Sequence, residues 1–405
     1  MWTNCLFITA ILLGLSIAAP SSKRTADFTI RQVARSRQTW QSPVDSYRRA
    51  LLRFERSVSK IDTLSPPPGQ QGTVQATPDE DDMQYLSPVK VGDQTLNVAI
   101  DTGSADLWVF SSGQPQSQLR ERNYYTPGAS AKKLEGASWY IHYGDGTDAG
   151  GDVYMDEVVV GSVKAPSQAV QAARNVSSVL VEDGKIEGIM GLGFNSHNTV
   201  KPQRQRTFFE NVMDSLSRPL FTVSLKYHKP GAFDFGFIDC KKYKGDITYT
   251  AVNSTGGWWE FTASSYAVGD KTFNTPITGI ADTGTTYLLL PDRYVNNYYA
   301  HVPNATKTHD SWEFPCNTTL PPFTMIISGT TGNKDSKPST YRATVPGKHL
   351  NAKSIHPGSD TCFGGLQPTS LDSGTFGDVF FKSQFVIFDR SSPEPILGFA
   401  EALDI

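Results

Sequence analysis

The clearest sign of chemistry in this sequence is a pair of aspartates in the same local context. Asp101 and Asp282 each follow an apolar run and begin an Asp-Thr-Gly-Ser/Thr tetrapeptide, 181 residues apart. Two carboxylates that share one proton can supply both a base that activates water and an acid that protonates an oxygen. A lone Asp-Thr-Gly is common and would ordinarily be a strand end capped by an Asx turn. Its repetition instead predicts a duplicated lobe with one carboxylate in each copy.

The elements that must position these aspartates have a β-type pattern. An apolar element rich in glycine follows each aspartate at a comparable distance, with Gly188 after Asp101 and Gly377 after Asp282. Short alternating runs bounded by turn residues predict strands. The sequence lacks the alternation of strands with helices that is typical of a parallel βαβ sheet. The clearest strands are Gln84–Val91, Gln94–Ile100, Leu107–Phe110, Ser138–Tyr143 and Val153–Val160. Helical signals are few, and the better ones are Gln205–Leu216 and Pro291–His301, with Pro291 expected at the first helical position.

Composition excludes several other classes of protein. The 405 residues are 38% hydrophobic and 19% charged, which excludes a disordered polyelectrolyte, and the 34 Gly and 25 Pro have no collagen-like period. The seven His form no ligand-spaced cluster, and neither a Gly-x-Ser-x-Gly nor a His-Glu-x-x-His motif occurs. We therefore expect no cofactor and no metal.

Four motifs taken together resemble those of the pepsin-like aspartic proteases, in particular the secreted fungal aspergillopepsin and penicillopepsin type. They are Asp101–Val109, Tyr143–Gly146, Asp282–Thr286 and Phe376–Phe381, and the similarity extends from about Gln84 to the C-terminus. The resemblance implies an all-β fold with few short helices. It also implies two β-barrel-like lobes with the active-site cleft between them.

The resemblance assigns roles to the residues of the two Asp-Thr-Gly loops. Asp101 and Asp282 would form the catalytic dyad, whose single proton belongs to the pair rather than to either residue. The neighbouring residues would support them: the glycines by allowing close approach, the first threonines by cross-bonding the loops, and the next hydroxyls by bonding the outer carboxylate oxygens. These supporting residues are Thr102, Gly103, Ser104, Thr283, Gly284 and Thr285.

The resemblance also implies a flap that closes over the substrate. The turn Tyr143-Gly144-Asp145 lies between two predicted strands, although an ordinary exposed turn would have the same sequence. Tyr143 would cover the cleft and bond the indole of Trp108, and Thr286 would join the substrate-binding residues. In fungal relatives an acid at the position of Asp145 accompanies acceptance of Lys at P1, beside a hydrophobic preference. Residues 258–261 (Trp-Trp-Glu-Phe) would border the cleft or belong only to the core.

The N-terminal region predicts processing. Residues 1–18 have an uncharged apolar run followed by small residues, which predicts a signal peptide, with a buried N-terminal helix as the alternative. Residues 20–64 carry a formal charge of +6 and the remainder −9. A basic arm for nucleic acid does not suit a secreted protein, so we expect an inhibitory propeptide over 19–70, released in acid, in which Lys60 could reach the dyad. The lobes would then span 71–250 and 251–405.

Cysteines and sequons agree with secretion. Once the signal peptide is removed, Cys240, Cys316 and Cys362 remain. Their number is odd, and sequence alone permits three pairings. We favour Cys316–Cys362, whose loop would contribute roughly 2–4 kcal/mol, and expect Cys240 to be a buried thiol in the strand-like run Phe233–Cys240. Candidate N-glycosylation sites are Asn175, Asn253, Asn304 and Asn317.

The sequence therefore predicts a secreted, extracellular aspartic endopeptidase made as a zymogen and active on proteins and peptides in acid. Its own propeptide would be an intramolecular inhibitor, and we expect a monomer with no nucleic-acid partner and no membrane or lipid anchor. One alternative is a catalytically silent binding or inhibitor protein of the same fold, although Asp101, Asp282 and Tyr143 are all present. A β-rich glycosidase with a carboxylate pair is another, but it leaves the repeated motif unexplained.

Overall fold

The computed structural model describes residues 69–143, 146–309, 311–331 and 337–403. The predicted signal peptide, Lys60 and all of the predicted propeptide up to residue 68 lie outside the described residues, as do Gly144 and Asp145 of the predicted flap. Strands form three sheets within the described part of the chain.

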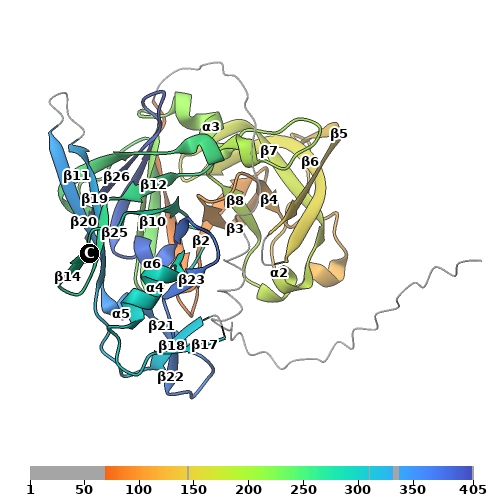
Figure 1. Cartoon of the computed structure of the whole chain (residues 1–405). Helices are drawn as coiled ribbons and strands as arrows, with labels where there is room; N and C mark the ends of the chain where they lie inside the picture. Colours follow the sequence, from red (N-terminus) through yellow and green to blue (C-terminus); the bar gives the residue numbers. More distant parts are fainter. Residues whose placement is uncertain (1–68, 144–145, 310, 332–336, 404–405) are drawn as a thin grey trace, which may run out of the picture. The chain divides into compact units, whose positions relative to one another are not determined.

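The largest sheet has 17 strands and contains both the Asp101 loop and the C-terminal strand (Figure 1). Its strands are β1 (Gly72–Pro78), β2 (Tyr85–Val91), β3 (Gln94–Asp101), β4 (Leu107–Val109), β5 (Lys132–His142), β6 (Asp148–Val160), β7 (Val163–Val176), β8 (Gly188–Gly191), β9 (Leu220–Lys226), β10 (Lys229–Phe235), β11 (Tyr243–Ala251), β13 (Ser265–Val268), β14 (Lys271–Phe273), β19 (Phe323–Thr331), β20 (Pro338–Val345), β25 (Gln384–Asp389) and β26 (Ile396–Ala402).

Two smaller sheets complete the strand structure. The five-stranded sheet leads to the Asp282 loop, and the four-stranded sheet carries one end of the disulfide. The first consists of β12 (Glu260–Ala263), β15 (Ile277–Ala281), β24 (Gly374–Phe376), β16 (Leu288–Pro291) and β23 (Leu366–Thr369). The second consists of β17 (Thr306–Thr308), β18 (Ser311–Pro315), β22 (Thr361–Gly364) and β21 (Asn351–Ser354).

The sequence repeat is also a repeat of strand topology. β3, which ends at Asp101, pairs in parallel with β8, and β4 pairs antiparallel with the same β8. Likewise β15, which ends at Ala281, pairs in parallel with β24, and β16 pairs antiparallel with β24. Figure 1 shows β3, β4 and β8 together in the same region of the structure. Each aspartate therefore lies at the end of the same three-stranded arrangement, and the expectation of an all-β fold with a repeated plan is confirmed for the described residues.

Several strands match their predicted bounds, and two are longer. β2, β3 and β4 agree with the prediction to within one residue, whereas β5 begins at Lys132 and β6 at Asp148. A register irregularity between Lys133 and Ser138 interrupts the alternation on which the prediction of β5 depended. β6 also contains Gly150 and Gly151. Glycine usually weakens a strand, but here the backbone of neighbouring strands lies too close for a side chain. A Cβ at Gly151 would lie 2.1 Å from the carbonyl oxygen of Ala172.

Among the described residues helices are few and short, as predicted, but their ends differ from the prediction. They are α2 (Ser178–Asp183), α3 (Phe208–Val212), α4 (Asp292–Tyr299), α5 (Gly347–Leu350) and α6 (Asp378–Phe381). α3 begins late because Thr207 and Glu210 form a capping box, and it ends in a 3-10 turn over Met213–Ser215. The expectation that Pro291 is the first helical residue is wrong, because Pro291 has extended backbone angles and ends β16. None of the helices in the described ranges is long and apolar enough to cross a membrane.

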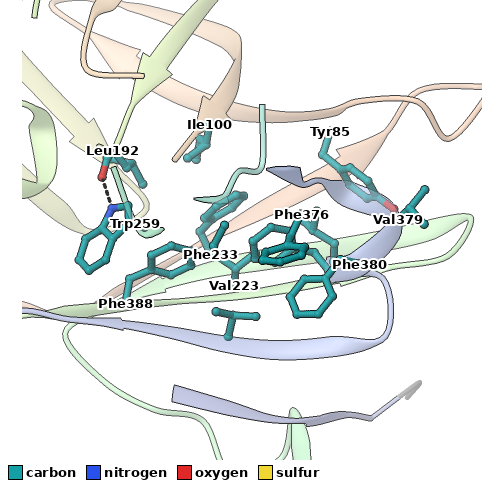
Figure 2. Packing of buried hydrophobic residues seen from close by; sticks show 14 of the residues in the cluster. Tyr85, Ile100, Leu192, Val223, Phe233, Trp259, Phe376, Val379, Phe380 and Phe388 are labelled. Carbon is teal, nitrogen blue, oxygen red and sulfur yellow. Dashed lines mark hydrogen bonds between the residues drawn. The ribbon is translucent and has the colours of Figure 1, made fainter. Parts of the chain in front are cut away.

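One large hydrophobic cluster packs behind both aspartates. It includes Ile100, which precedes Asp101, and Ala281, which precedes Asp282. Figure 2 shows Ile100 and Leu192 at the upper edge of this cluster, with Trp259 beside Leu192 and the labelled phenylalanines below Ile100. Because both residues that precede the aspartates belong to one buried apolar core, the positions of the two loops depend on the same packing.

The cysteine predictions had mixed outcomes. Cys316 and Cys362 form the predicted disulfide, which joins the end of β18 to β22. The expectation that Cys240 is a buried thiol within a strand is wrong, because β10 ends at Phe235 and Cys240 is exposed in the turn that follows. The apolar pattern that predicted a strand is produced by Phe233, Phe235 and the half-buried Ile238, with a left-handed Gly236 between them.

Candidate active site

Asp101 is held by donors from its own loop. The backbone N–H of Gly103 donates to Oδ1 at 2.8 Å, and the hydroxyl of Ser104 donates to Oδ2 at 2.7 Å. The backbone carbonyl of Asp101 also accepts a hydrogen bond from the N–H of Leu192, next to β8. Only 1% of Asp101 is exposed, so these donors replace most of the water that a free carboxylate would bind.

Asp282 is held in the same way by the second loop. The N–H of Gly284 donates to Oδ1 at 2.9 Å, and the hydroxyl of Thr285 donates to Oδ2. The N–H of Asp282 donates to the carbonyl of Phe376 in β24, and the aspartate is fully buried. The expected hydrogen bonds from Ser104 and Thr285 to the carboxylate oxygens are therefore both present.

The two loops are bonded to each other by their first threonines. The hydroxyl of Thr102 donates to the carbonyl of Ala281 at 2.8 Å and accepts from the N–H of Thr283 at 3.0 Å. The reciprocal pair also exists: the hydroxyl of Thr283 donates to the carbonyl of Ile100 at 2.6 Å and accepts from the N–H of Thr102 at 3.2 Å. All four bonds are buried, so the expected cross-bonding joins the loops just behind their aspartates.

Close approach of the loops requires a glycine. A Cβ at Gly103 would lie 2.4 Å from Oδ1 and 2.5 Å from Cγ of Asp282. The carboxylate of the second loop therefore lies directly against the backbone of the first. This arrangement brings Asp101 and Asp282, 181 residues apart, to one site.

Trp108 and Tyr143 form the expected bond between the Asp101 loop and the flap. The indole Nε1–H of Trp108 donates to the hydroxyl of Tyr143 at 2.6 Å, and both side chains are buried. Trp139 of β5 stacks on Trp108 with ring centroids 6.1 Å apart, and Ile141 belongs to the same apolar cluster. β5, which leads to the predicted flap, is thus packed onto β4, which follows the Asp101 loop.

Other sequence-predicted residues lie at several places. The hydroxyl of Thr286 donates to the backbone carbonyl of Met83, so it anchors the segment before β2. Trp259 and Phe261 are core residues, and the indole of Trp259 donates to the carbonyl of Leu192 at 3.1 Å, as Figure 2 shows. Trp258 is half-buried and stacks on His197. The tetrapeptide 258–261 is therefore mainly a core element that contacts the chain next to Asp101.

Sequence reasoning missed two buried acids near the aspartates. Asp106 and Asp378 are almost fully buried, and each has one carboxylate oxygen without a hydrogen-bond partner. Burial raises the pKa of Asp106 to about 6, against hydrogen bonding from Thr199 and Gln171 that lowers it, and the charge of Asp101 adds to the rise. Burial also raises the pKa of Asp378 well above its usual range, opposed by Lys382 and reinforced by Asp282. Asp106 lies in the motif Asp101–Val109 and Asp378 in the motif Phe376–Phe381. In both, a charged residue within an apolar run could have indicated a buried acid.

The four sequon asparagines, Asn175, Asn253, Asn304 and Asn317, are all exposed. The side-chain amide of Asn253 donates to Glu260 at 2.7 Å, so that asparagine is already hydrogen-bonded. No group of three or more His, Cys, Asp or Glu within the described ranges is arranged to hold a metal ion.

Known proteins are similar to this chain over almost its whole length. The family model described as eukaryotic aspartyl protease matches residues 84–402. Aspergillopepsin-1 of Aspergillus fumigatus is 46% identical over 403 residues, and aspergillopepsin-1 of Aspergillus clavatus is 45% identical over 401. Each alignment covers 97% of this chain and 98% of the relative. Penicillopepsin-3 of Penicillium janthinellum is 43% identical over 398 residues, which cover 97% of both chains.

The chain therefore belongs to the eukaryotic aspartyl protease family and is an aspartic endopeptidase. The resemblance to the aspergillopepsin and penicillopepsin type is confirmed.

The cross-bonded threonines generate a test of how the loops are held. The substitution Thr283→Val keeps the side-chain volume but removes the hydroxyl, which leaves the carbonyl of Ile100 and the N–H of Thr102 without their hydrogen-bond partner. We expect the free energy of unfolding to fall by about 2–4 kcal/mol, because buried groups left unpaired are costly. Urea unfolding followed by fluorescence measures the loss.

The matched control is Thr262→Val on β12, whose exposed hydroxyl bonds only the hydroxyl of Thr278. That change should alter the free energy of unfolding by less than about 1 kcal/mol. Equal losses in the two variants would contradict the special role of the loop threonines.

Proposed function

We propose that this protein is an acid endopeptidase that hydrolyses peptide bonds of proteins with Asp101 and Asp282 as its catalytic dyad. The observation that carries the proposal is the contact between the two loops, in which the carboxylate of Asp282 lies against the backbone of Gly103. Two carboxylates held this close cannot both ionise at low cost. One shared proton is therefore the arrangement that suits water-mediated attack on an amide.

The chain's own groups suit each part of this chemistry. The hydroxyls of Ser104 and Thr285 fix one oxygen of each carboxylate, so the other oxygens, which accept the N–H groups of Gly103 and Gly284, would face each other and a catalytic water. The ionised member of the pair would take a proton from this water, and the protonated member would donate one to the carbonyl oxygen of the substrate. Tyr143, held by Trp108, would close over the reacting groups and exclude bulk water.

The dyad is tested by cleavage of acid-denatured globin with the acid-treated protein across pH, with and without pepstatin. We expect cleavage that is confined to acid and abolished by pepstatin. An Asp101→Asn variant should lose about 100- to 10,000-fold in kcat/KM, the range for removal of a general acid–base group. Asp93→Asn, an exposed aspartate in the turn before β3, is the matched control and should keep its activity.

A folded protein that cleaves nothing would instead support the alternative of a silent binding protein. Retention of wild-type kcat/KM by Asp101→Asn would exclude the proposed dyad.

A second part of the proposal is control by a propeptide. Residues 1–18 would be removed as a signal peptide, residues 19–70 would form the propeptide, and the lobes would span 71–250 and 251–405. The +6 charge of residues 20–64 against −9 for the remainder would hold the propeptide by long-range attraction. Acid protonates carboxylates of the body and weakens that attraction, so release should follow a fall in pH.

This control is tested on the purified precursor. Size-exclusion chromatography and activity after incubation between pH 7 and pH 3 should show propeptide release that begins only in acid. High salt at pH 7 should weaken the attraction in the same direction, because ions screen exposed charges. A precursor that stays bound and inactive at every pH would contradict the proposal.

The peptide preference is proposed to be broadly hydrophobic on both sides of the scissile bond, with Lys also accepted at P1. The basis is Asp145, the acid that the resemblance places in the flap. A Lys ammonium at P1 would be attracted by this carboxylate, and such a partly exposed ion pair is worth about 1 kcal/mol or less. We therefore expect Asp145→Thr to lower kcat/KM for a Lys-P1 peptide several-fold relative to a Phe-P1 peptide. Unchanged Lys-P1 cleavage would remove this assignment.

Secretion and glycosylation complete the proposal. The exposed positions of Asn175, Asn304 and Asn317 are suited to glycan attachment in a secreted protein, and Asn253 is exposed as well. The disulfide between Cys316 and Cys362 suits an oxidising compartment. The partners would be protein or peptide substrates and the chain's own propeptide, with the enzyme a monomer.

A further inference from the structure

Asp106 is a buried acid for which the dyad chemistry provides no role. Its Oδ1 accepts three hydrogen bonds, from the side-chain amide of Asn198 at 3.1 Å and from both the N–H and the hydroxyl of Thr199 at 3.0 Å. Its Oδ2 is buried and has no partner. An ionised carboxylate would carry charge on both oxygens, so this arrangement satisfies only half of that charge. A neutral carboxyl suits it better, with Oδ1 as the acceptor and the proton on Oδ2.

The surroundings of Asp106 contain few charges. Asn198 and Thr199 contact it from the segment after the 3-10 turn 195–197, and β7 contributes the neutral Gln171, which is bonded to Asn198. The amide nitrogen of Gln171 makes no hydrogen bond in this structure, but the Gln171 side chain lies close enough to Asp106 to favour its ionised form, against the larger effect of burial. The charged group that faces Asp106 is Asp101, whose negative charge opposes a second negative charge. No cation offsets the ionised form of Asp106 among the interactions of the described residues.

The backbone of Asp106 belongs to the loop that carries the site. Its carbonyl accepts the N–H of Gly191, which pairs with Asp101 across β3 and β8. The same Asn198 amide that bonds the carboxyl also donates to the carbonyl of Ala105. Two residues to either side lie Ser104, which bonds Asp101, and Trp108, which bonds Tyr143. The hydrogen bonds of the Asp106 carboxyl thus hold the middle of this segment. Its two ends, Ser104 and Trp108, bond Asp101 and Tyr143.

We propose that Asp106 is a positioning residue: its neutral carboxyl holds the loop from Ser104 to Trp108 in its working arrangement, and its ionisation at rising pH releases that loop. Oδ2 accepts no hydrogen bond in this arrangement, and the Gln171 amide alone would not replace the water around a free carboxylate, so full hydration of the ionised group requires the loop to open. Opening moves Ser104 from Asp101 and Trp108 from Tyr143. This inference rests on the proposed dyad. It adds that the active enzyme must keep a second proton, the one on the Asp106 carboxyl.

The raised pKa of Asp106, about 6, places this ionisation between acid and neutral pH. Because the carboxyl has an ordinary value of 3.8 when unfolded, the unfolded chain ionises first as pH rises. The stability that the neutral Asp106 contributes is therefore complete below pH 3.8. It declines as the pH rises towards 6, and above that value it is gone.

The test compares pH profiles of kcat/KM for the wild type, Asp106→Asn and Asp156→Asn, each normalised to its own maximum. Asn keeps the Oδ1 acceptor and the neutral state but has no proton to lose. Above pH 6 the wild type should lose two protons, giving a slope of about −2 in log kcat/KM, and Asp106→Asn only the dyad proton, giving about −1. Asp156 is the matched control, since it is equally buried in β6 but bonded by Tyr125 and Ser130.

Equal slopes in the wild type and Asp106→Asn, or an equal change in Asp156→Asn, would overturn the proposal. If Asp106→Asn does not fold, Thr199→Val serves as the second variant. It removes one donor to Asp106 and should move the steep limb upward by about 0.5 pH unit, since that hydrogen bond favours the ionised form. A limb that stays or moves downward would contradict the role of Asp106.

A measurement without substrate separates this proposal from the dyad. Between pH 4 and pH 7 the unfolding midpoint should fall more in the wild type than in Asp106→Asn, and Asp156→Asn should follow the wild type. If no protein cleaves globin, the dyad proposal fails while this comparison still tests Asp106. An equal fall in all three proteins would overturn the Asp106 proposal even in an active enzyme.

Discussion

The structure depends on the reciprocal bonds of Thr102 and Thr283. Each hydroxyl accepts a backbone N–H of the other loop and donates to the carbonyl that precedes the other aspartate. These four buried hydrogen bonds join two segments that are 181 residues apart. This junction positions the rest of the site, because the groups that donate hydrogen bonds to each carboxylate come from the same two loops.

The junction is supported on each side by repeated strand topology and by a shared core. The parallel pairs β3 with β8 and β15 with β24 place each loop at a strand end, and one apolar cluster lies behind both. Trp259 adds a bond from the second half of the chain to Leu192, whose N–H holds Asp101. The chemistry proposed for the aspartates thus requires the folding of both halves.

The sequence predicted the parts of this arrangement that are local or repeated. The Asp-Thr-Gly loops, the bond between Trp108 and Tyr143 and the pairing of Cys316 with Cys362 all follow from motifs, spacing or family resemblance. Burial could not be predicted in the same way, because it depends on segments distant in sequence. The environment of Asp106 is completed by Asn198 and Thr199, more than 90 residues later. The exposure of Cys240 likewise depends on where β10 ends.

Gly103 illustrates how the two halves of the chain limit each other's divergence. Its lack of a side chain is required by the carboxylate of Asp282 and by nothing within its own loop's backbone angles, since its φ is not in the left-handed region. Whether another residue can replace Gly103 therefore depends on Asp282, which lies in the other copy of the motif. After duplication, such a pair of loops can no longer accumulate changes independently, and the two copies evolve as one unit.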